Sequence, residues 1–188
     1  GCELVDNPTE TGIKSLHVRR ADKNPSDGAV WNFPNGWKGM LTTRVMLRKG
    51  SQGGWISLND RFFDPCDDQG ESLAVFRAAL ERDGSIGSMK MEPDRWYELS
   101  FRWNLEERTC QLTVDGKEAG VLEIANPTLN GLSYVRFRSS AKKLDNAGFL
   151  VDWVSVDIED PYAPACSAEE QAEQEKSYIE TVVPLWKT

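Results

Sequence analysis

The sequence is short of the residues on which several common kinds of site depend. It has one histidine, His17, in 188 residues, which excludes a metal site with several histidine ligands and leaves histidine-based acid–base catalysis to a single side chain. Its four cysteines form no CxxC pair, which argues against a zinc site or a thioredoxin-type site. A P-loop, a GxSxG motif, an HExxH motif and a dinucleotide-binding fingerprint are also missing.

Membrane and nucleic-acid partners are disfavoured for similar reasons. No apolar run approaches the roughly 18 residues that a membrane-spanning helix needs. No basic segment followed by an apolar stretch opens the sequence, so we expect a mature form or an excised piece rather than a precursor with a signal peptide. The net charge of −8 and the pI near 4.8 argue against nucleic-acid binding, which needs a basic face to neutralise phosphates.

What the chain does have is tryptophan, and its charge is spread unevenly. Seven tryptophans are more than the core of one domain of this length needs. Residues 1–50 carry eight basic and five acidic side chains, residues 51–160 carry twelve and twenty, and residues 161–188 carry two and five. The first block is the only basic one, and its small excess is too weak to indicate an anionic partner.

Short alternating segments separated by Gly, Asn and Asp dominate the chain. In residues 96–103 the apolar side chains take every second position, which places them on one face of a strand. Asp115-Gly116 is typical of a two-residue hairpin turn, because Gly tolerates a positive φ. Many such segments without a helical pattern between them predict an all-β fold, a β-sandwich of two antiparallel sheets. The other predicted strands are residues 16–19, 29–33, 41–47, 55–58, 73–80, 85–91, 110–114, 121–124, 134–138 and 149–158.

One helix is predicted, near the end of the sequence. Ser167-Ala-Glu-Glu170 forms a capping box, and the acidic side chains that follow complement the helix dipole at its N-terminal end. The helix should run from about residue 167 to residue 181 and end before Pro184. Its apolar stripe is thin, which indicates either a loosely docked tail or a segment that meets a partner. We therefore divide the chain into a β-sandwich over residues 1–160 and a tail over residues 161–188.

Three segments resemble one superfamily. The Trp-led strand, polar turn and Val-Asp-Gly ending of residues 96–117 resemble the concanavalin A-like and laminin G jelly rolls, and residues 148–156 fit the same pattern. Residues 53–84 look like domains appended to sialidase-like, BNR-repeat proteins. The resemblance spans roughly residues 12–160 and implies a jelly-roll fold with a short C-terminal helix. It does not fix an activity, because the superfamily holds glucanases, lyases, lectins and adhesion modules.

Tryptophan supplies the main indication of function. Trp31, Trp37 and Trp55 lie in Gly-, Asn- and Pro-rich segments that we expect to form loops, where a tryptophan is harder to explain as core than in a strand. Sugar recognition needs such flat apolar groups with polar groups around them, although capping of the sandwich ends explains the same residues equally well. The candidate ligand-binding residues are Trp31, Trp37, Trp55, Arg44, Tyr134, Arg136 and Arg138.

Tyr134, Arg136 and Arg138 take alternate positions of one predicted strand, which places them on one face of it. Such a face can bind an acidic sugar through bidentate arginine contacts, and an ordinary polar outer face is the alternative. In a polysaccharide lyase, Tyr134 or His17 would act as the base and the arginines would neutralise a uronate. A glycosidase needs two carboxylates facing one cleft, and the Glu-x-Asp-x-x-Glu motif of the superfamily's glucanases is absent, so no catalytic residue is assigned.

A dense acidic segment, residues 59–71, is a candidate calcium-binding segment. Hard carboxylate oxygens at short spacing suit this ion, the spacing does not match an EF-hand loop, and a solvated loop is the alternative. Loops of the superfamily often hold calcium, which makes a structural calcium ion the one cofactor we consider. The candidate ligands are Asp60, Asp64, Asp67 and Asp68.

The cysteines leave two possibilities open. An even count suits one or two disulfides in a secreted protein, and Cys2 and Cys166 flank the strand-rich region, so a Cys2–Cys166 bridge is the preferred pairing. The alternative is four reduced thiols in a cytosolic protein, because a domain of this length is stable without bridges.

Together these observations predict a non-catalytic carbohydrate-binding or accessory module of a secreted, sialidase-like protein. The partner would be a glycan or polysaccharide, and the location extracellular, cell-surface or periplasmic. A glycoside hydrolase or polysaccharide lyase with an unusual site is the first alternative. The second is a structural domain that packs against a neighbouring domain or a second copy.

Overall fold

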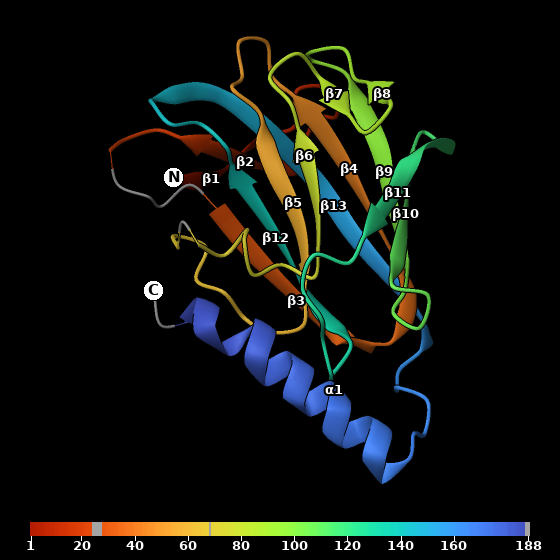
Figure 1. Cartoon of the computed structure of the whole chain (residues 1–188). Helices are drawn as coiled ribbons and strands as arrows, with labels where there is room; N and C mark the ends of the chain where they lie inside the picture. The colour runs from red at the N-terminus through yellow and green to blue at the C-terminus, as the bar shows by residue number, and fades with distance from the viewer. Residues whose placement is uncertain (24–27, 68, 187–188) are drawn as a thin grey trace.

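The computed structural model describes residues 1–23, 28–67 and 69–186 and consists mainly of antiparallel strands (Figure 1). The larger of its two main sheets has seven strands. In spatial order these are β1 (Cys2–Asp6), β2 (Lys14–Arg20), β13 (Asp145–Asp160), β4 (Lys38–Leu47), β9 (Trp96–Asn104), β10 (Thr109–Val114) and β11 (Lys117–Glu123).

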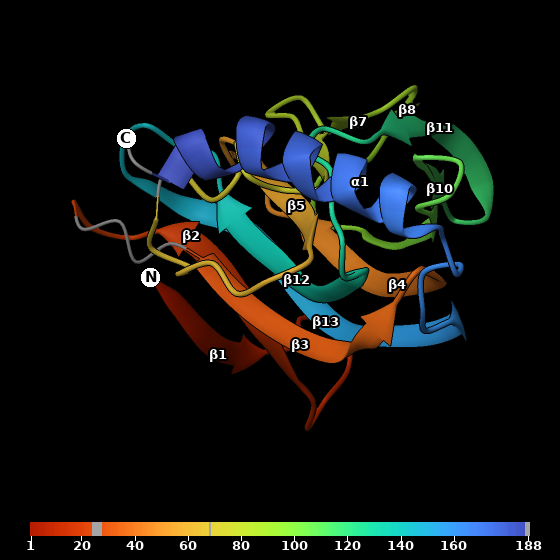
Figure 2. The ribbon, with the colours of Figure 1, turned by 60° about the horizontal axis from the view of Figure 1, so that its bottom comes forward.

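The smaller sheet has four strands and packs face to face against the larger one (Figure 2). In spatial order these are β3 (Gly28–Gly36), β12 (Leu132–Ser139), β5 (Gly54–Asn59) and β6 (Phe76–Leu80). A separate hairpin pairs β7 (Ser85–Ile86) with β8 (Met89–Lys90), where the sequence pattern predicts one continuous strand over residues 85–91. The predicted β-sandwich of two antiparallel sheets is confirmed.

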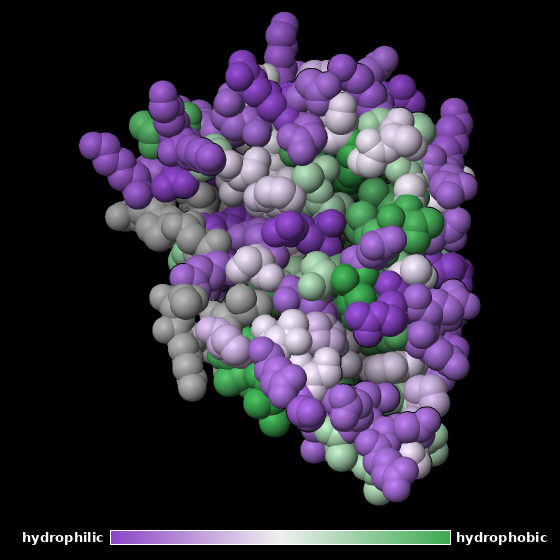
Figure 3. All heavy atoms as spheres, viewed as in Figure 1, coloured by the Kyte–Doolittle hydropathy of each residue, from purple (hydrophilic) through white to green (hydrophobic). Residues whose placement is uncertain are grey.

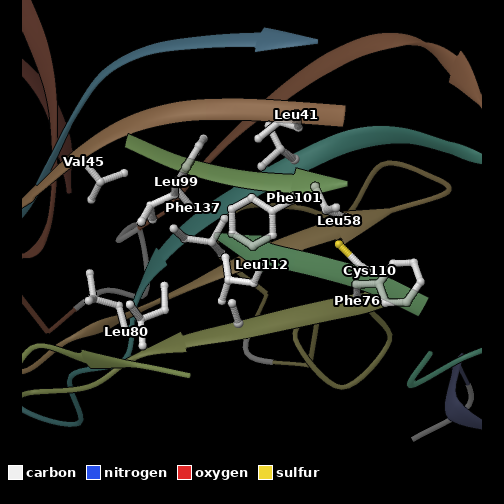
Figure 4. Close-up of a cluster of buried hydrophobic side chains, with 14 of the residues drawn as sticks. Leu41, Val45, Leu58, Phe76, Leu80, Leu99, Phe101, Cys110, Leu112 and Phe137 are labelled. Atoms are coloured by element: carbon white, nitrogen blue, oxygen red, sulfur yellow. The ribbon is translucent and has the colours of Figure 1, made fainter. Parts of the chain in front are cut away.

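The core lies between the two sheets and follows from the alternation of apolar residues along each strand. In β9, Leu99 and Phe101 are 0% exposed and Trp103 is 1% exposed, so the period-two pattern predicts the buried face correctly. Figure 4 shows how residues such as Leu112 of the large sheet and Phe137 of the small sheet point toward one another. The indole Nε1 of Trp103 donates to the Gly36 carbonyl oxygen over 3.1 Å, which satisfies the one polar atom that this large side chain buries.

The predicted hairpin turn also forms. Asp115 and Gly116 have φ angles of 48° and 72°, and they connect Val114 to its ladder partner Lys117 at the ends of β10 and β11. Both turn residues need a positive φ in such a turn, which Gly and Asp adopt more readily than bulky residues.

The helix α1 (Ala168–Thr181) follows β13 and lies across one end of the smaller sheet (Figures 1 and 2). Both hydrogen bonds of the predicted capping box are present, between Ser167 and Glu170, so this prediction is confirmed. No residue of α1 is buried, but its C-cap residue, Val182, is 1% exposed and anchors the C-terminal end of the helix. Near that end the ring of Tyr178 lies 5.0 Å from the guanidinium carbon of Arg61. A short 3₁₀ helix, η1 (Val183–Trp186), follows, and no helix in the described residues is long and apolar enough to cross a membrane.

Candidate functional site

The tryptophans that we expected in loops lie mostly in strands. Trp31 belongs to β3 and Trp55 to β5, and only Trp37 lies between strands, at the turn from β3 to β4. The loop prediction is therefore wrong for Trp31 and Trp55. Their Gly- and Asn-rich neighbours are held in regular ladders with β12, because tertiary pairing overrides the weak local preference of these residues for turns.

The three tryptophans also differ in their surroundings. Trp31 is 41% exposed at the free edge of the small sheet, and its ring centroid is 5.9 Å from that of Phe33. Trp37 is partly buried against the core. Trp55 is partly buried on the outer face of the small sheet, where the guanidinium carbon of Arg77 lies 5.0 Å from its ring centroid. The structure therefore does not bring the three together.

Strand β12 places Tyr134, Arg136 and Arg138 on that same outer face. Their ladder partners in β5 are Asn59, Ser57 and Trp55, and the intervening side chains of β12 point into the core. The middle of this face is strongly hydrophilic, over β12, β5 and β6 (Figure 3). The face therefore combines an aromatic ring with charged groups, which is the combination that the sequence predicts for a ligand site.

The two arginines are nevertheless covered rather than presented to solvent. Arg136 is 0% exposed and Arg138 is 3% exposed, because the described residues between β5 and β6 fold over them. Glu71 from this connection ion-pairs with both guanidinium groups, over 3.1 Å to Arg136 and 3.2 Å to Arg138. Both arginines also donate to the backbone carbonyl of Asp67. The prediction that Arg136 offers a bidentate contact to a ligand is wrong for this conformation.

Burial controls the charges of this ion-paired group, which we call the Arg136–Arg138–Glu71 triad. Removal from water disfavours any charged form, so it lowers the pKa of Arg136 and raises the pKa of Glu71, while the opposite charges nearby counteract both shifts. The chain approaches so closely that a Cβ atom on Gly70 would lie 1.7 Å from Nη1 of Arg136. Glycine is therefore the only residue that this position accepts without displacing the arginine.

A hollow of about 370 Å³ opens beside the triad. We call it the Trp55 hollow, because Trp55 is its one aromatic side chain. The structure forms it where the end of β2, the start of the β12–β13 turn and β5 meet, and Arg20 Nη1 donates to the carbonyl oxygen of Ala141 over 2.8 Å across its wall. Its lining residues are Arg20, Trp55, Glu71, Arg138, Ser139, Ser140, Ala141 and Lys142.

Two of the sequence-predicted ligand residues, Trp55 and Arg138, meet in this hollow. Sequence reasoning missed Arg20 and Lys142, and no local signal identifies them, since they lie far from Trp55 along the chain and come near it only through strand pairing. A surface hollow that joins one indole, several charged groups and hydroxyl groups can orient a small polar ligand by stacking and hydrogen bonding.

Arg44 lies elsewhere, on the outer face of the large sheet. Its Nη1 is 2.5 Å from Oε1 of Glu10 and 2.9 Å from Oδ2 of Asp152, and its guanidinium carbon lies 5.1 Å from the ring centroid of Trp96. The hydrogen bond to Glu10, above all, raises the pKa of Arg44. Arg44 thus ties the β1–β2 turn to the sheet, and it does not contribute to the Trp55 hollow.

The lyase arrangement with His17 as the base is not assembled. The His17 ring nitrogen Nε2 lies 2.6 Å from the carbonyl oxygen of Ala147, on the large sheet. Tyr134 lies on the small sheet, with its ring centroid 6.3 Å from that of the exposed Phe62. A base at His17 and a charge-neutralising group at Arg136 therefore belong to different faces.

The acidic segment does not form a cation site in the described residues. Asp60 is buried and accepts two hydrogen bonds from Arg61 and one from Thr128. Asp64 and Asp67 accept hydrogen bonds from the backbone amides of residues 66 and 69, and Asp68 lies outside the described residues. The described part of the chain contains no group of three potential metal ligands. Asp60, Asp64 and Asp67 therefore do not converge on one cation site, and the calcium expectation, which also includes Asp68, stays a prediction.

The predicted Cys2–Cys166 bridge is not formed. Cys2 begins the edge strand β1, whereas Cys166 is exposed just before α1. Figures 1 and 2 place the N-terminus and the beginning of α1 at opposite sides of the molecule. The two cysteines flank the strand-rich region in sequence but lie apart in space, because the long strand β13 carries the chain to the far end of the sandwich.

No protein-family model matches the sequence, and no curated protein sequence is similar to it. Among solved structures, a sialidase is similar with a TM-score of 0.57 and 17% identity, over 85% of this chain and 17% of the sialidase. A galectin from Caenorhabditis elegans has a TM-score of 0.50 and 13% identity, over 74% of this chain and 94% of the galectin. The receptor binding domain of a botulinum neurotoxin C/D mosaic serotype has a TM-score of 0.52 and 12% identity, over 93% of this chain and 45% of that chain. The chain therefore has a lectin-like β-sandwich fold, and it spans only a small part of the sialidase.

Proposed function

We propose that the chain is a non-catalytic carbohydrate-binding or accessory module of a secreted, glycan-active protein. The observation that carries the proposal is the Trp55 hollow, which joins an indole ring to hydroxyl and charged groups on a sheet face. Pyranose rings bind by stacking their C–H faces on aromatic rings while polar groups around them accept and donate hydrogen bonds.

The comparisons support the same class of function through the fold. The similar structures include a galectin, a toxin's receptor binding domain and a sialidase, of which this chain matches only 17%. An accessory role suits a segment that corresponds to a small part of an enzyme. Fold alone does not assign an activity, so the proposal depends on the residues of the hollow.

Binding to a glycan array, followed by calorimetric titration of the best ligand, tests this proposal. We expect Trp55→Ala to weaken binding roughly twofold to tenfold, because it removes an aromatic contact surface, which is worth roughly 0.5–1.5 kcal/mol. Trp153→Ala is the matched control: Trp153 is 39% exposed in β13 and does not line the hollow. Unchanged binding by Trp55→Ala would remove the hollow as the site, and no binding to any glycan would refute the function.

A further inference from the structure

The last part of β13 forms an unpaired edge of the large sheet. On one side β13 pairs with β4 from Phe149 to Asp160. On its other side the ladder with β2 ends at the pair Leu16–Val151, and no other strand in the described part of the chain pairs with β13 there. Residues 154–159, which we call the free β13 edge, therefore present backbone N–H and C=O groups to which an additional strand can be joined.

The space beside the free β13 edge is lined by apolar side chains that the core covers only in part. Val154, Val156 and Ile158 pack against the core and are partly buried. The strand β3, at the edge of the small sheet, contacts β13 (Figure 2). Its Trp31 is the ladder partner of the buried Val135, so the indole points between the sheets, yet it is 41% exposed. The sandwich is therefore open on this side, between two edge strands.

The free β13 edge lies in a segment with more negative than positive charge. Residues 152–160 contain four acidic side chains and no basic one. Asp157 is exposed and makes no ion pair with a described residue. Three cations face the other acidic side chains, and two of these cations are shared with carboxylates of neighbouring segments. The interactions are those of Arg102 with Glu159, of Arg44 with Asp152 and Glu10, and of Lys38 with Asp160 and Glu106.

We propose that the free β13 edge binds an extended peptide of a partner protein, one in which basic residues alternate with apolar residues. The peptide would add a strand to the large sheet, so that backbone hydrogen bonds hold it and alternate side chains select it. Because successive side chains of a strand point to opposite faces, its apolar side chains would lie between the sheets, beside Val156, and its basic side chains would lie on the outer face, beside Asp157.

The same charges argue against a second copy of this chain as the occupant. Two free β13 edges paired with one another would bring acidic side chains together, and like charges on facing strands are destabilising. A basic strand meets the opposite situation. The proposed surface uses none of the residues that line the Trp55 hollow, so it is independent of the proposed glycan binding.

Four synthetic peptides test this proposal by calorimetric titration. The parent alternates Lys and Val over the length of the free β13 edge, and the second peptide has Glu in place of each Lys. The other two keep the parent's side chains and carry N-methyl groups, one on every Lys amide and one on every Val amide, because successive amides of a strand point to opposite sides. We expect the acidic peptide and only one of the methylated peptides to bind about tenfold or more weakly than the parent.

Two acidic residues at opposite edges of the large sheet provide matched variants. Asp157 lies on the free β13 edge, whereas Glu118 is exposed in β11 at the other end of the strand order. We expect Asp157→Asn to weaken binding of the parent peptide about twofold to fivefold, the value of an exposed ion pair. Glu118→Gln should leave it within about 1.5-fold, since a distant charge is screened. In NMR spectra, the parent peptide should shift the backbone amide signals of residues 154–159.

Each contrary result overturns the proposal for a stated reason. No binding of the parent peptide would show that the edge does not accept a strand. Equal binding of the two methylated peptides would assign the binding to charge alone, since an added strand uses one of its two edges. Amide shifts confined to another strand, such as β11, would place the peptide elsewhere. Light scattering of the free protein that detects a dimer, if the parent peptide dissociates it, would assign the edge to a second copy.

Discussion

Removal of the Glu71 carboxylate should destabilise the whole sandwich. In Glu71→Gln, the fully buried guanidinium group of Arg136 would face a neutral amide in place of its carboxylate partner. Breaking a buried ion pair on one side costs about 3–5 kcal/mol, because a charge is left without compensation away from water. For a chain of this length, 1 kcal/mol changes the melting temperature by roughly 2–4 °C. We therefore expect a fall of roughly 6–20 °C.

Urea and thermal unfolding, followed by circular dichroism and tryptophan fluorescence, measure this loss. Coincidence of the two signals establishes that one transition is being observed. Glu81→Gln is the control: it makes the same change at an exposed position, where we expect a change within about 0.5 kcal/mol. Far-UV spectra of both variants before unfolding show whether the native sheets remain.

A triple variant separates lost compensation from lost packing. Replacing Arg136 and Arg138 by Met and Glu71 by Leu removes all three charges and keeps side chains of similar size. Well-packed apolar residues in place of a buried ionic group are often neutral or stabilising, so we expect the triple variant to recover most of the stability that Glu71→Gln loses. The reasoning would be refuted by a loss below about 1 kcal/mol in Glu71→Gln, the value for an exposed pair.

Two further predictions concern the turn before β7 and the beginning of α1. Asp83 accepts a hydrogen bond from the Ser85 backbone amide, which, with the Ser85 side chain and Lys90, lowers the pKa of Asp83 from 3.8 to about 2. The stability that the ionised Asp83 contributes to the fold should be complete above pH 3.8 and lost as pH falls through about 2. Unfolding of the wild type and of Asp83→Asn across this range measures the contribution, and an NMR titration of the carboxyl carbon gives the pKa. A pKa near 3.8 would contradict the turn geometry. Ser167→Ala removes the side-chain cap of α1 and should destabilise the helix by about 1 kcal/mol. Amide hydrogen exchange measures this: we expect faster exchange confined to the first turns of α1, whereas unchanged exchange would show that the cap is not formed.

The fold could be predicted from the sequence because the sequence patterns that indicate it are local. Alternation in residues 96–103, the Asp115-Gly116 turn and the Ser167 capping box each depend on neighbours within a few positions. These signals predict strands, a hairpin and a helix boundary without knowledge of the tertiary structure.

The site could be predicted only in part, because the residues that form it are far apart in the sequence. Alternate positions place Arg136 and Arg138 on the outer face of β12, and an outer face is normally solvated. The connection that carries Glu71 covers them, and it lies more than 60 residues earlier in the sequence. The alternation of residue types along β12 contains no information about this connection. For the same reason Arg20 and Lys142 could not be assigned to the hollow, whereas Trp55 was identified by its residue type.

The attachment of α1 has a consequence for how the chain opens. The helix has no buried residue of its own and is held near its C-terminal end, by the buried C-cap residue Val182 and by the Tyr178–Arg61 stacking. A cation–π contact of this kind is worth only about 0.5–1 kcal/mol. Segments held this weakly open independently of the global transition. The chain therefore has two stability scales: a sandwich whose central amides exchange only through global unfolding, and a terminal helix that undocks and re-forms while the sandwich remains folded.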